Sequence, residues 1–323
     1  MHKKLLLLIA GLFLFTPAAV KASYSAMSCN SRQLLASSQP YTIQSVASIS
    51  KVMTAIVAVE HSNLDELVTI NEEITKMNGS SVYLQVGQTV TMRTLLYGLL
   101  LRSGNDAAIA IADHVGNGSI DRFVGYMNDK AAQLGMVNTF FLNPSGLDDH
   151  DAGNQSTAYD MSLLMCSGLQ YPILQEIMAT KTYKTEYDHV WSNKNRLLQI
   201  YAYTTGGKTG FTKKAGRTLI SSAWNGYPIA IATFRVADDF SFHKNLYESL
   251  YKTYKSYVLV RKGNYYYKSR QYLVEQDLTI ITDQYDPQNV SISYDAQTQE
   301  LIVTYQHKTG KQVYKIPGRK GRP

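Results

Sequence analysis

The spacing of apolar residues changes character along this chain, and the change constrains its fold. In the first half apolar residues recur every three or four positions, which is typical of amphipathic helices. Helices are predicted at 48–61, 94–101, 106–115, 121–134, 159–167 and, later, 243–254. A strand pair turning at Asn30-Ser31 is predicted at 24–35, and neighbouring strands around a turn at Asn225-Gly226 are predicted at 218–223 and 229–235. The chain is therefore expected to combine helices with strands around a substantial core.

Beyond residue 256 the chain is rich in tyrosine and its pattern becomes strand-like throughout. Short strands separated by polar turns are predicted at 278–282, 290–294, 301–306 and 312–316. This predicts a small β-rich domain at 256–316, following a larger domain at 23–255. The last residues, 317–323, are expected to form a basic tail.

The first 22 residues predict a secretory signal peptide. A basic start at Lys3 and Lys4 precedes an uninterrupted apolar run from Leu5 to Phe15, and small residues allow cleavage after Ala22. The run is shorter than the ~20 residues of a membrane-spanning helix. An uncleaved N-terminal anchor is the alternative, and in both cases the rest of the chain is expected to be exported.

The positive charge of the chain is concentrated near its end. The formal net charge is +7, and six Lys or Arg but no Asp or Glu follow residue 300. On an exported protein such a segment suits weak association with an anionic envelope, whereas no nucleic-acid-binding motif is present. A solvated tail without a partner is the alternative.

The chain contains two cysteines, Cys29 and Cys166. Export would permit a disulfide, but Cys29 lies in a strand-like segment and Cys166 in an apolar helical one. We expect two buried thiols.

Three short motifs could support nucleophilic catalysis, namely Ser-x-x-Lys, Ser-x-Asn and Lys-Thr-Gly, and each occurs more than once. A nucleophilic serine needs a base within hydrogen-bond reach, and Ser48 and Lys51 share one face of a predicted apolar helix. The pairs that begin at Ser241 and Ser249 lie in a polar segment, which indicates a solvated helix surface.

Context selects among the other repeats. Ser103-Gly104-Asn105 interrupts two apolar helices, an unusual place for polar residues unless they face a site. Lys208-Thr209-Gly210 follows two glycines, and a strand there would present it along a cleft. Lys308-Thr309-Gly310, in contrast, is predicted to form a hairpin turn, as is Ser28-Cys29-Asn30. The candidate site therefore comprises Ser48, Lys51, Ser103, Asn105, Lys208, Thr209 and Gly210.

These motifs and their flanking residues resemble the low-molecular-mass penicillin-binding proteins, the serine-type D-alanyl-D-alanine carboxypeptidase family. The resemblance covers about residues 24–255 and includes the segments 47–54, 99–108, 143–147 and 207–212 in the family's order. It implies an α/β (α+β) serine penicillin-recognising fold, in which an antiparallel sheet is flanked by helices and the site lies between the sheet edge and a helical lobe. The small all-β C-terminal domain would follow.

The resemblance also implies a reaction on peptidoglycan stem peptides. Ser48 would be acylated by the penultimate D-alanine carbonyl, releasing terminal D-alanine, and β-lactam antibiotics would inhibit the enzyme. Lys51 would act as the base, its ammonium form disfavoured by the charge of Lys208. Ser103 would relay protons, and Asn105 would hold a substrate amide.

The third motif would complete the site. Lys208 and Thr209 would bind the terminal carboxylate, and Gly210 belongs to the same motif. The N–H groups of Phe211 and Ser48 would form the oxyanion hole. The resemblance implies no cofactor and no metal.

Some positions depart from the family's pattern. Ser50 stands where Thr is common, and Tyr159 where Arg is common. A basic residue near the start of the last helix is often Arg, and here the candidates are His243 and Lys244. The usual C-terminal amphipathic membrane-binding helix is not expected, because residues 316–323 cannot form one.

The same residues leave several other functions to consider. A β-lactamase would need an efficient deacylating group, usually a glutamate, yet residues 143–160 hold aspartates and no glutamate. A D,D-endopeptidase acting on cross-links would use the same motifs. A non-catalytic penicillin-binding protein would not require all seven site residues. Metal-dependent hydrolysis is disfavoured, because the histidines are scattered and no His-Glu-x-x-His occurs.

Overall fold

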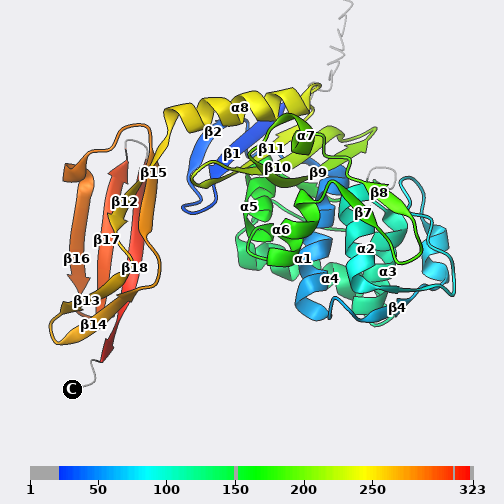
Figure 1. Ribbon diagram of the computed structural model, residues 1–323, viewed down its shortest axis with the longest axis horizontal. Coiled ribbons are helices and arrows are strands. Elements are labelled where there is room, and N and C mark those ends of the chain that lie inside the picture. Colours follow the sequence, from blue (N-terminus) through cyan, green and yellow to red (C-terminus); the bar gives the residue numbers. More distant parts are fainter. Residues whose placement is uncertain (1–21, 149–151, 308–309, 321–323) are drawn as a thin grey trace, which may run out of the picture.

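The computed structural model describes residues 22–148, 152–307 and 310–320. Its larger part combines a sheet with helices, and helix α8 (Asp239–Thr253) leads from it into a smaller part built of strands (Figure 1). Apart from Ala22, the predicted signal peptide lies outside the described residues. Among the described residues no helix has the length and apolar character needed to cross a membrane.

The larger part is organised around a five-stranded antiparallel sheet, as the resemblance implied. The strand order is β2-β1-β11-β10-β9, so the first strands of the chain pair with strands some 200 residues later. Strand β9 forms one edge. The bounds are β1 (Ser23–Ser28), β2 (Leu34–Ser38), β9 (Thr204–Thr212), β10 (Gly216–Trp224) and β11 (Pro228–Phe234).

Helices cover both faces of this sheet. Successive side chains of a strand point to opposite faces, and successive residues of the central strands are apolar, so both faces are buried. Ile229 and Ile231 of β11 belong to the cluster packed under α8, whereas Ala230 and Ala232 belong to the larger cluster on the opposite face. Figure 1 shows α8 along one face and helices α5 and α6 on the other. Burial of each such isoleucine stabilises the fold by roughly 1.5–3 kcal/mol.

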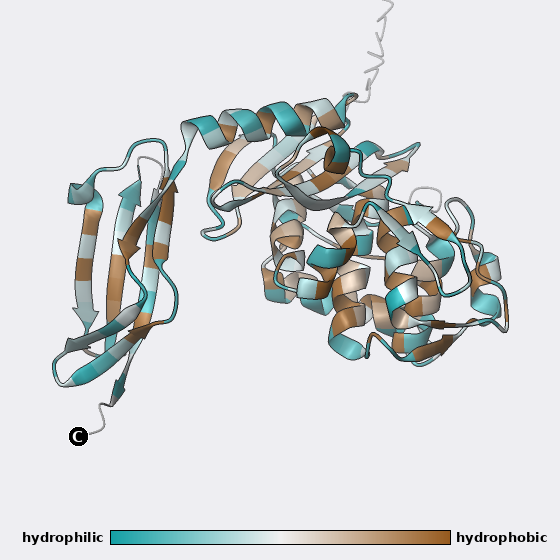
Figure 2. Cartoon of the chain, viewed as in Figure 1, coloured by the Kyte–Doolittle hydropathy of each residue, from teal (hydrophilic) through white to brown (hydrophobic). Residues whose placement is uncertain are grey.

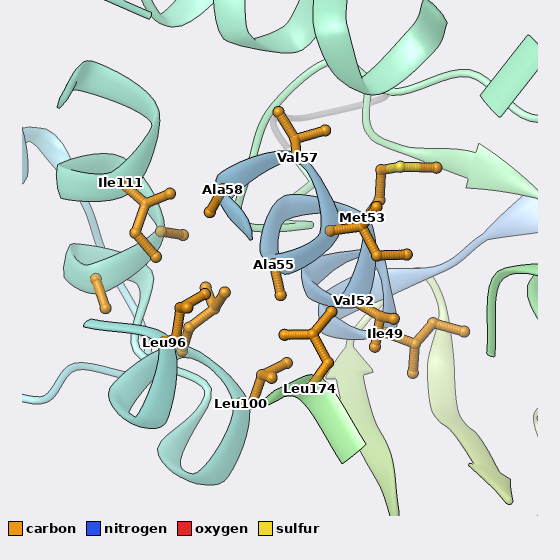
Figure 3. Packing of buried hydrophobic residues seen from close by; sticks show 14 of the residues in the cluster. Ile49, Val52, Met53, Ala55, Val57, Ala58, Leu96, Leu100, Ile111 and Leu174 are labelled. Carbon is orange, nitrogen blue, oxygen red and sulfur yellow. The ribbon is translucent and has the colours of Figure 1, made fainter. Parts of the chain in front are cut away.

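Helix α1 (Lys51–His61) lies at the centre of the larger core. Its residues from Lys51 to Ala58 are all buried, and Figure 3 shows it surrounded by apolar side chains that include Leu96, Leu100, Ile111 and Leu174. The neighbouring helices are α2 (Met92–Tyr97), α3 (Asn105–Val115), α4 (Ile120–Leu134), α5 (Ala158–Gly168) and α6 (Pro172–Ala179). A helix enclosed on all sides fixes its first turn firmly in place.

Most of the predicted helices are present, with two differences. Helix α6 was missed, and the segment predicted as one helix at 94–101 is α2 followed by a π-helical turn, η3 (Gly98–Arg102). π-Helical turns are often found at functional sites, and Ser103 directly follows this one. The larger part also contains three short helices, η1 (Ala47–Ser50), η2 (Glu72–Lys76) and α7 (Leu197–Ile200). Three two-stranded sheets lie outside the main sheet: β3 (Gln44–Ser45) with β6 (Gln155–Ser156), β4 (Leu67–Thr69) with β5 (Thr89–Thr91), and β7 (Thr182–Lys184) with β8 (Val190–Ser192).

The expectation of two free thiols is wrong, because Cys29 and Cys166 form a disulfide. Cys29 directly follows β1 and Cys166 lies on α5, which packs against β1 and brings the two Cα atoms to 5.1 Å. The bond joins positions 137 residues apart. A loop of that size is expected to stabilise the fold by on the order of 4–5 kcal/mol through the entropy of the unfolded chain.

The smaller part is all-β, as predicted. Strand β12 (Lys255–Val260) pairs with β15 (Leu278–Thr282). A separate five-stranded sheet has the strand order β13 (Gly263–Tyr267), β14 (Arg270–Val274), β18 (Gly310–Lys320), β17 (Glu300–His307) and β16 (Val290–Asp295). The short helix η4 (Pro287–Asn289) directly precedes β16 in the chain. Apolar and polar residues alternate along these strands in Figure 2. Strands β12, β13 and β14 lie in the tyrosine-rich segment that was predicted to be strand-like without individual bounds.

The boundary of the basic tail was placed too early. Strand β18 continues through Pro317 to Lys320, and its last residues pair with β14. Backbone pairing with β14 thus extends the strand beyond the end of its apolar pattern. The expected hairpin at the second Lys-Thr-Gly is flanked by paired His307 and Gly310, while Lys308 and Thr309 themselves lie outside the described residues.

Candidate active site

Ser48 lies in the short helical turn η1, which leads directly into α1. The preceding residue, Ala47, has a left-handed backbone (φ 51°), a strained conformation for a residue other than glycine. Gly146 (φ 78°) packs so closely here that a Cβ on it would lie 2.1 Å from the Ala47 carbonyl oxygen. The loop that contains Gly146 therefore supports the turn that carries Ser48.

A buried lysine joins Ser48 to the second motif. Lys51 Nζ donates to Ser48 Oγ at 3.1 Å and to Asn105 Oδ1 at 2.7 Å. It also donates to the Ser145 carbonyl oxygen, to which Ser48 Oγ donates at 3.4 Å. Asn105 is held in turn, because its Nδ2 donates to the Asn78 carbonyl at 2.6 Å. Ser48, Lys51 and Asn105 thus form one connected hydrogen-bonded cluster.

A second cluster connects Ser103 with Lys208. Lys208 Nζ donates to Ser103 Oγ at 2.9 Å and to the Thr209 carbonyl at 2.6 Å. Ser103 follows the π-helical turn η3 and has a left-handed backbone (φ 65°), which ends the helical conformation there. The structure therefore brings the three motifs together from α1, the η3–α3 junction and the edge strand β9.

Because residue 210 is a glycine, β9 can pass close to the backbone of Ser48. A Cβ at this position would lie 2.4 Å from Thr218 Oγ1 and 3.0 Å from the Ser48 backbone nitrogen. Only glycine permits that approach. Thr209 and Phe211 flank it on the edge strand, and the Phe211 side chain is exposed. The N–H of Ser48 lies in a first helical turn, where backbone donors lack partners within the helix.

Both site lysines have lowered pKa values. Burial, and then the positive charge of Lys194, lowers the pKa of Lys51 to about 7, partly opposed by Asp106. Burial also lowers the pKa of Lys208 well below its usual value, followed by the charges of Lys51 and Lys194. The expected repulsion between the two lysines therefore acts on Lys208, whose pKa the charge of Lys51 lowers, whereas the pKa of Lys51 is lowered by burial and then by Lys194.

Three functional groups were missed by the sequence analysis as site components. Lys194 donates to Ser80 Oγ at 3.2 Å beside the site. The Asp106 carboxylate accepts the N–H groups of Val82 and Leu84, which fixes the neighbouring 81–84 segment. The third group is the Ser145 carbonyl described above. The available signal for Asp106 was its position directly after Asn105, in the first turn of a helix with a largely apolar sequence, while nothing local distinguished Lys194.

Neither residue expected to replace the family's arginine supplies charge to the site. His243 is buried between Ser221 Oγ (2.7 Å) and Thr233 Oγ1 (2.9 Å). Burial lowers its pKa to about 3, so it is neutral. Lys244 lies on the surface of α8, 3.9 Å from the Glu248 carboxylate. Among the described residues no cluster of three or more His, Cys, Asp or Glu side chains could hold a metal.

Serine acyl transfer with a lysine base requires a serine hydroxyl beside a lysine that can be neutral near pH 7. Ser48 and the buried Lys51 meet this requirement. Residues 15–236 match the family described as D-alanyl-D-alanine carboxypeptidase, Peptidase_S11. The chain belongs to this family.

Individual relatives agree with that assignment. D-alanyl-D-alanine carboxypeptidase DacF of Bacillus subtilis is 36% identical over 197 residues, covering 58% of this chain and 49% of that protein. The D-alanyl-D-alanine endopeptidase of Pseudomonas aeruginosa is 34% identical over 199 residues, covering 59% of this chain and 63% of that protein. Penicillin binding protein 5 from Haemophilus influenzae has the same fold, with a TM-score of 0.78 and 24% identity, over 92% of this chain and 96% of its own. The matched region thus spans about half the length of DacF.

The two Lys-Thr-Gly motifs make a matched pair for mutagenesis. Lys208→Ala is expected to slow acylation by a labelled penicillin by about 10²-fold or more, because a buried charge-stabilising group is lost. Lys308→Ala should leave the rate nearly unchanged, since the neighbouring His307 and Gly310 belong to the smaller domain. The acylation rates are measured by gel fluorescence. Equal effects of the two substitutions would contradict the assignment of Lys208, and not Lys308, to the site.

Proposed function

We propose that this protein is a serine-type D-alanyl-D-alanine carboxypeptidase that removes the terminal D-alanine from peptidoglycan stem peptides. The observation that carries the proposal is the 3.1 Å contact between Lys51 Nζ and Ser48 Oγ, with the pKa of Lys51 lowered to about 7. A base with that pKa can be neutral at physiological pH and still return its proton to a leaving group.

In the acylation step, neutral Lys51 takes the proton of Ser48 Oγ as the oxygen attacks the penultimate D-alanine carbonyl. The negative charge on the carbonyl oxygen is stabilised by the N–H groups of Ser48 and Phe211. The C–N bond then breaks, and the leaving D-alanine nitrogen receives the proton from Lys51. Ser103 serves as a proton relay in this transfer. A water molecule, deprotonated by the same lysine, hydrolyses the ester and regenerates Ser48.

The polar edge of β9 accounts for specificity toward a free carboxyl terminus. Lys208 and Thr209 bind the terminal carboxylate, and Asn105 receives a substrate amide. A bound carboxylate would favour the protonated form of Lys208, because an opposite charge raises the pKa of a buried amine. β-Lactams, which carry a carboxylate next to a reactive amide carbonyl, would occupy the same groups and acylate Ser48.

The experiment is mass spectrometry of the purified protein with a stem pentapeptide. Loss of one alanine per peptide is expected. A second substrate, a cross-linked muropeptide dimer, tests the endopeptidase activity after which one of the relatives is named. Cleavage of the dimer with an intact pentapeptide would replace the carboxypeptidase proposal. Penicillin acylation without turnover of either substrate would indicate a non-catalytic binding protein.

We further propose that the mature chain is exported and that the basic residues after position 300 attract the anionic envelope weakly. Such an attraction is screened by salt. The protein should therefore wash off envelope preparations at roughly 0.5–1 M salt, where the Debye length is only a few Å. Replacing Lys311, Arg319 and Arg322 with glutamine should reduce retention at low salt without changing penicillin acylation. Retention that yields only to detergent would instead mean an uncleaved N-terminal anchor.

A further inference from the structure

Two basic side chains lie at the rim of the candidate site, beside the second motif. Arg102 directly precedes Ser103, and Lys194 lies in the segment between β8 and α7. The Lys194 N–H donates to the Leu101 carbonyl at 3.1 Å. Arg102 Nη1 donates in turn to the Ser192 carbonyl at 3.2 Å. These two contacts join the segments that carry the two cations, and we name Arg102 and Lys194 the rim pair.

The rim pair carries positive charge that the protein does not neutralise. Among the described residues, neither side chain forms an ion pair with a carboxylate. Burial, and then the charge of Arg102, lowers the pKa of Lys194, as expected for neighbouring cations. Lys194 in turn acts on Lys51, where Asp106 opposes it, and on Lys208. A bound anion would relieve the mutual repulsion of these basic groups.

The rim pair lies next to the part of the site assigned to the upstream end of a peptide. Lys194 Nζ donates to Ser80 Oγ at 3.2 Å, and the N–H of Asn105 donates to the Ser80 carbonyl at 2.7 Å. Ser80 therefore connects Lys194 with the residue proposed to receive a substrate amide. The terminal carboxylate is assigned to Lys208 and Thr209 on β9. We expect a peptide held at both places to continue past Asn105 toward the rim pair.

Stem peptides carry other carboxylates upstream of their D-alanyl-D-alanine end. The second residue is a D-glutamyl unit linked through its γ-carbon, so its α-carboxylate is free unless it is amidated. The third residue has a further carboxylate where it is diaminopimelate. A guanidinium can bind a carboxylate through two parallel N–H donors, and a neighbouring ammonium can donate another hydrogen bond. The rim pair thus matches a group that such a substrate contains.

We propose that Arg102 and Lys194 bind a carboxylate of the stem peptide upstream of the scissile bond, so that the enzyme prefers acidic stem peptides over amidated ones. This inference rests on the proposed function, because it names a further part of the same substrate. The rim pair sets specificity and takes no part in acyl transfer. Lys194 is exposed and Arg102 half-buried, so the preference should be modest and sensitive to salt.

The test compares D-alanine release from two stem pentapeptides with lysine at the third position, one with a free D-glutamyl α-carboxylate and the other with its amide. The wild-type kcat/KM should be about 5- to 10-fold higher for the acidic peptide, as expected for one carboxylate on two rim cations. The preference should fall to about 2-fold in Arg102→Gln, in Lys194→Gln and in the wild type at about 0.5 M salt. A second pair, with the diaminopimelyl carboxylate free or amidated, identifies which carboxylate is bound.

The ratio of the two kcat/KM values separates recognition from other effects. Both peptides of a pair share the scissile bond, so a partly unfolded variant, or one with an altered pKa of Lys51, loses activity toward both and keeps the ratio. The matched control is Arg122→Gln. Arg122 also donates to a backbone carbonyl, that of Gly116, but this carbonyl lies at the opposite end of α3 from Asn105. The control should keep the wild-type ratio.

Equal kcat/KM values for the free and amidated forms in both pairs would overturn the inference and leave the proposed function standing. A preference that survives in both rim-pair variants would overturn it as well. Failure of the proposed function gives a different result, in which no peptide releases D-alanine. The peptide concentrations that halve the rate of penicillin acylation are then compared. A lower concentration for the acidic form would support the rim pair and contradict the carboxypeptidase proposal, whereas equal concentrations would overturn both.

Discussion

Replacing Ser48 with alanine is expected to abolish both the covalent penicillin adduct and the release of D-alanine. Ser48 Oγ is the hydroxyl that Lys51 contacts, and a strained turn holds it beside the narrow Gly210 strand. Without a nucleophile no acyl-enzyme can form, so the remaining groups could at most bind substrate. The adduct is measured by peptide mapping after incubation with a labelled penicillin.

Two other serines in the same sequence pattern provide the matched controls. Ser241 and Ser249 also precede a lysine by three positions, but both belong to α8 on the opposite face of the sheet. Ser241→Ala and Ser249→Ala should retain full labelling. A labelled peptide that contains either residue, or residual labelling of the Ser48→Ala protein, would refute the assignment of Ser48 as the nucleophile.

The residues of the candidate site could be selected from the sequence because each motif interrupts or follows a recognisable pattern. Ser48 and Lys51 lie three apart on an apolar helix, and Ser103 breaks another. The electrostatics could not be predicted in the same way. Lys194 is far from Lys51 in sequence, and only the folded chain brings its charge near the site. Likewise, the burial that neutralises His243 depends on Ser221 and Thr233 from two other strands.

The fold was predictable to the extent that local periodicity reflects burial. The helices around α1 and the strands β10 and β11 have clear apolar patterns, and their existence was predicted. Helix α6 was missed, and the bounds of β14 were not predicted, because their apolar patterns are short and mixed. The disulfide required knowing that α5 packs against β1, a contact between positions 137 residues apart. Local pattern carries no information about such a distance.

Replacing Lys51 with methionine, which is similar in length but has no amine, is expected to slow acylation by about 10³-fold. General-base catalysis contributes ~10²–10⁴-fold, and Lys51, the base we propose, is in contact with Ser48. Penicillin binding before acylation should be much less affected, because Lys208 and Thr209 of β9, which we propose to bind the carboxylate, remain. Stopped-flow measurement separates the binding step from the acylation rate. A variant that acylates at the wild-type rate would show that another group is the base.

The pH dependence of acylation should identify the lysine that acts and the charge that tunes it. Only neutral Lys51 accepts a proton, so the wild-type rate should fall about tenfold per pH unit below its pKa of about 7 and level off above it. Lys194 lowers that pKa through its positive charge. Lys194→Met should therefore raise the pKa and move the midpoint of the profile to higher pH, whereas Lys181→Met, at an exposed position, should not. A midpoint that stays fixed in the Lys194 variant would mean that burial alone sets the pKa of Lys51, and a midpoint that moved to lower pH would contradict the assignment of Lys51 as the base.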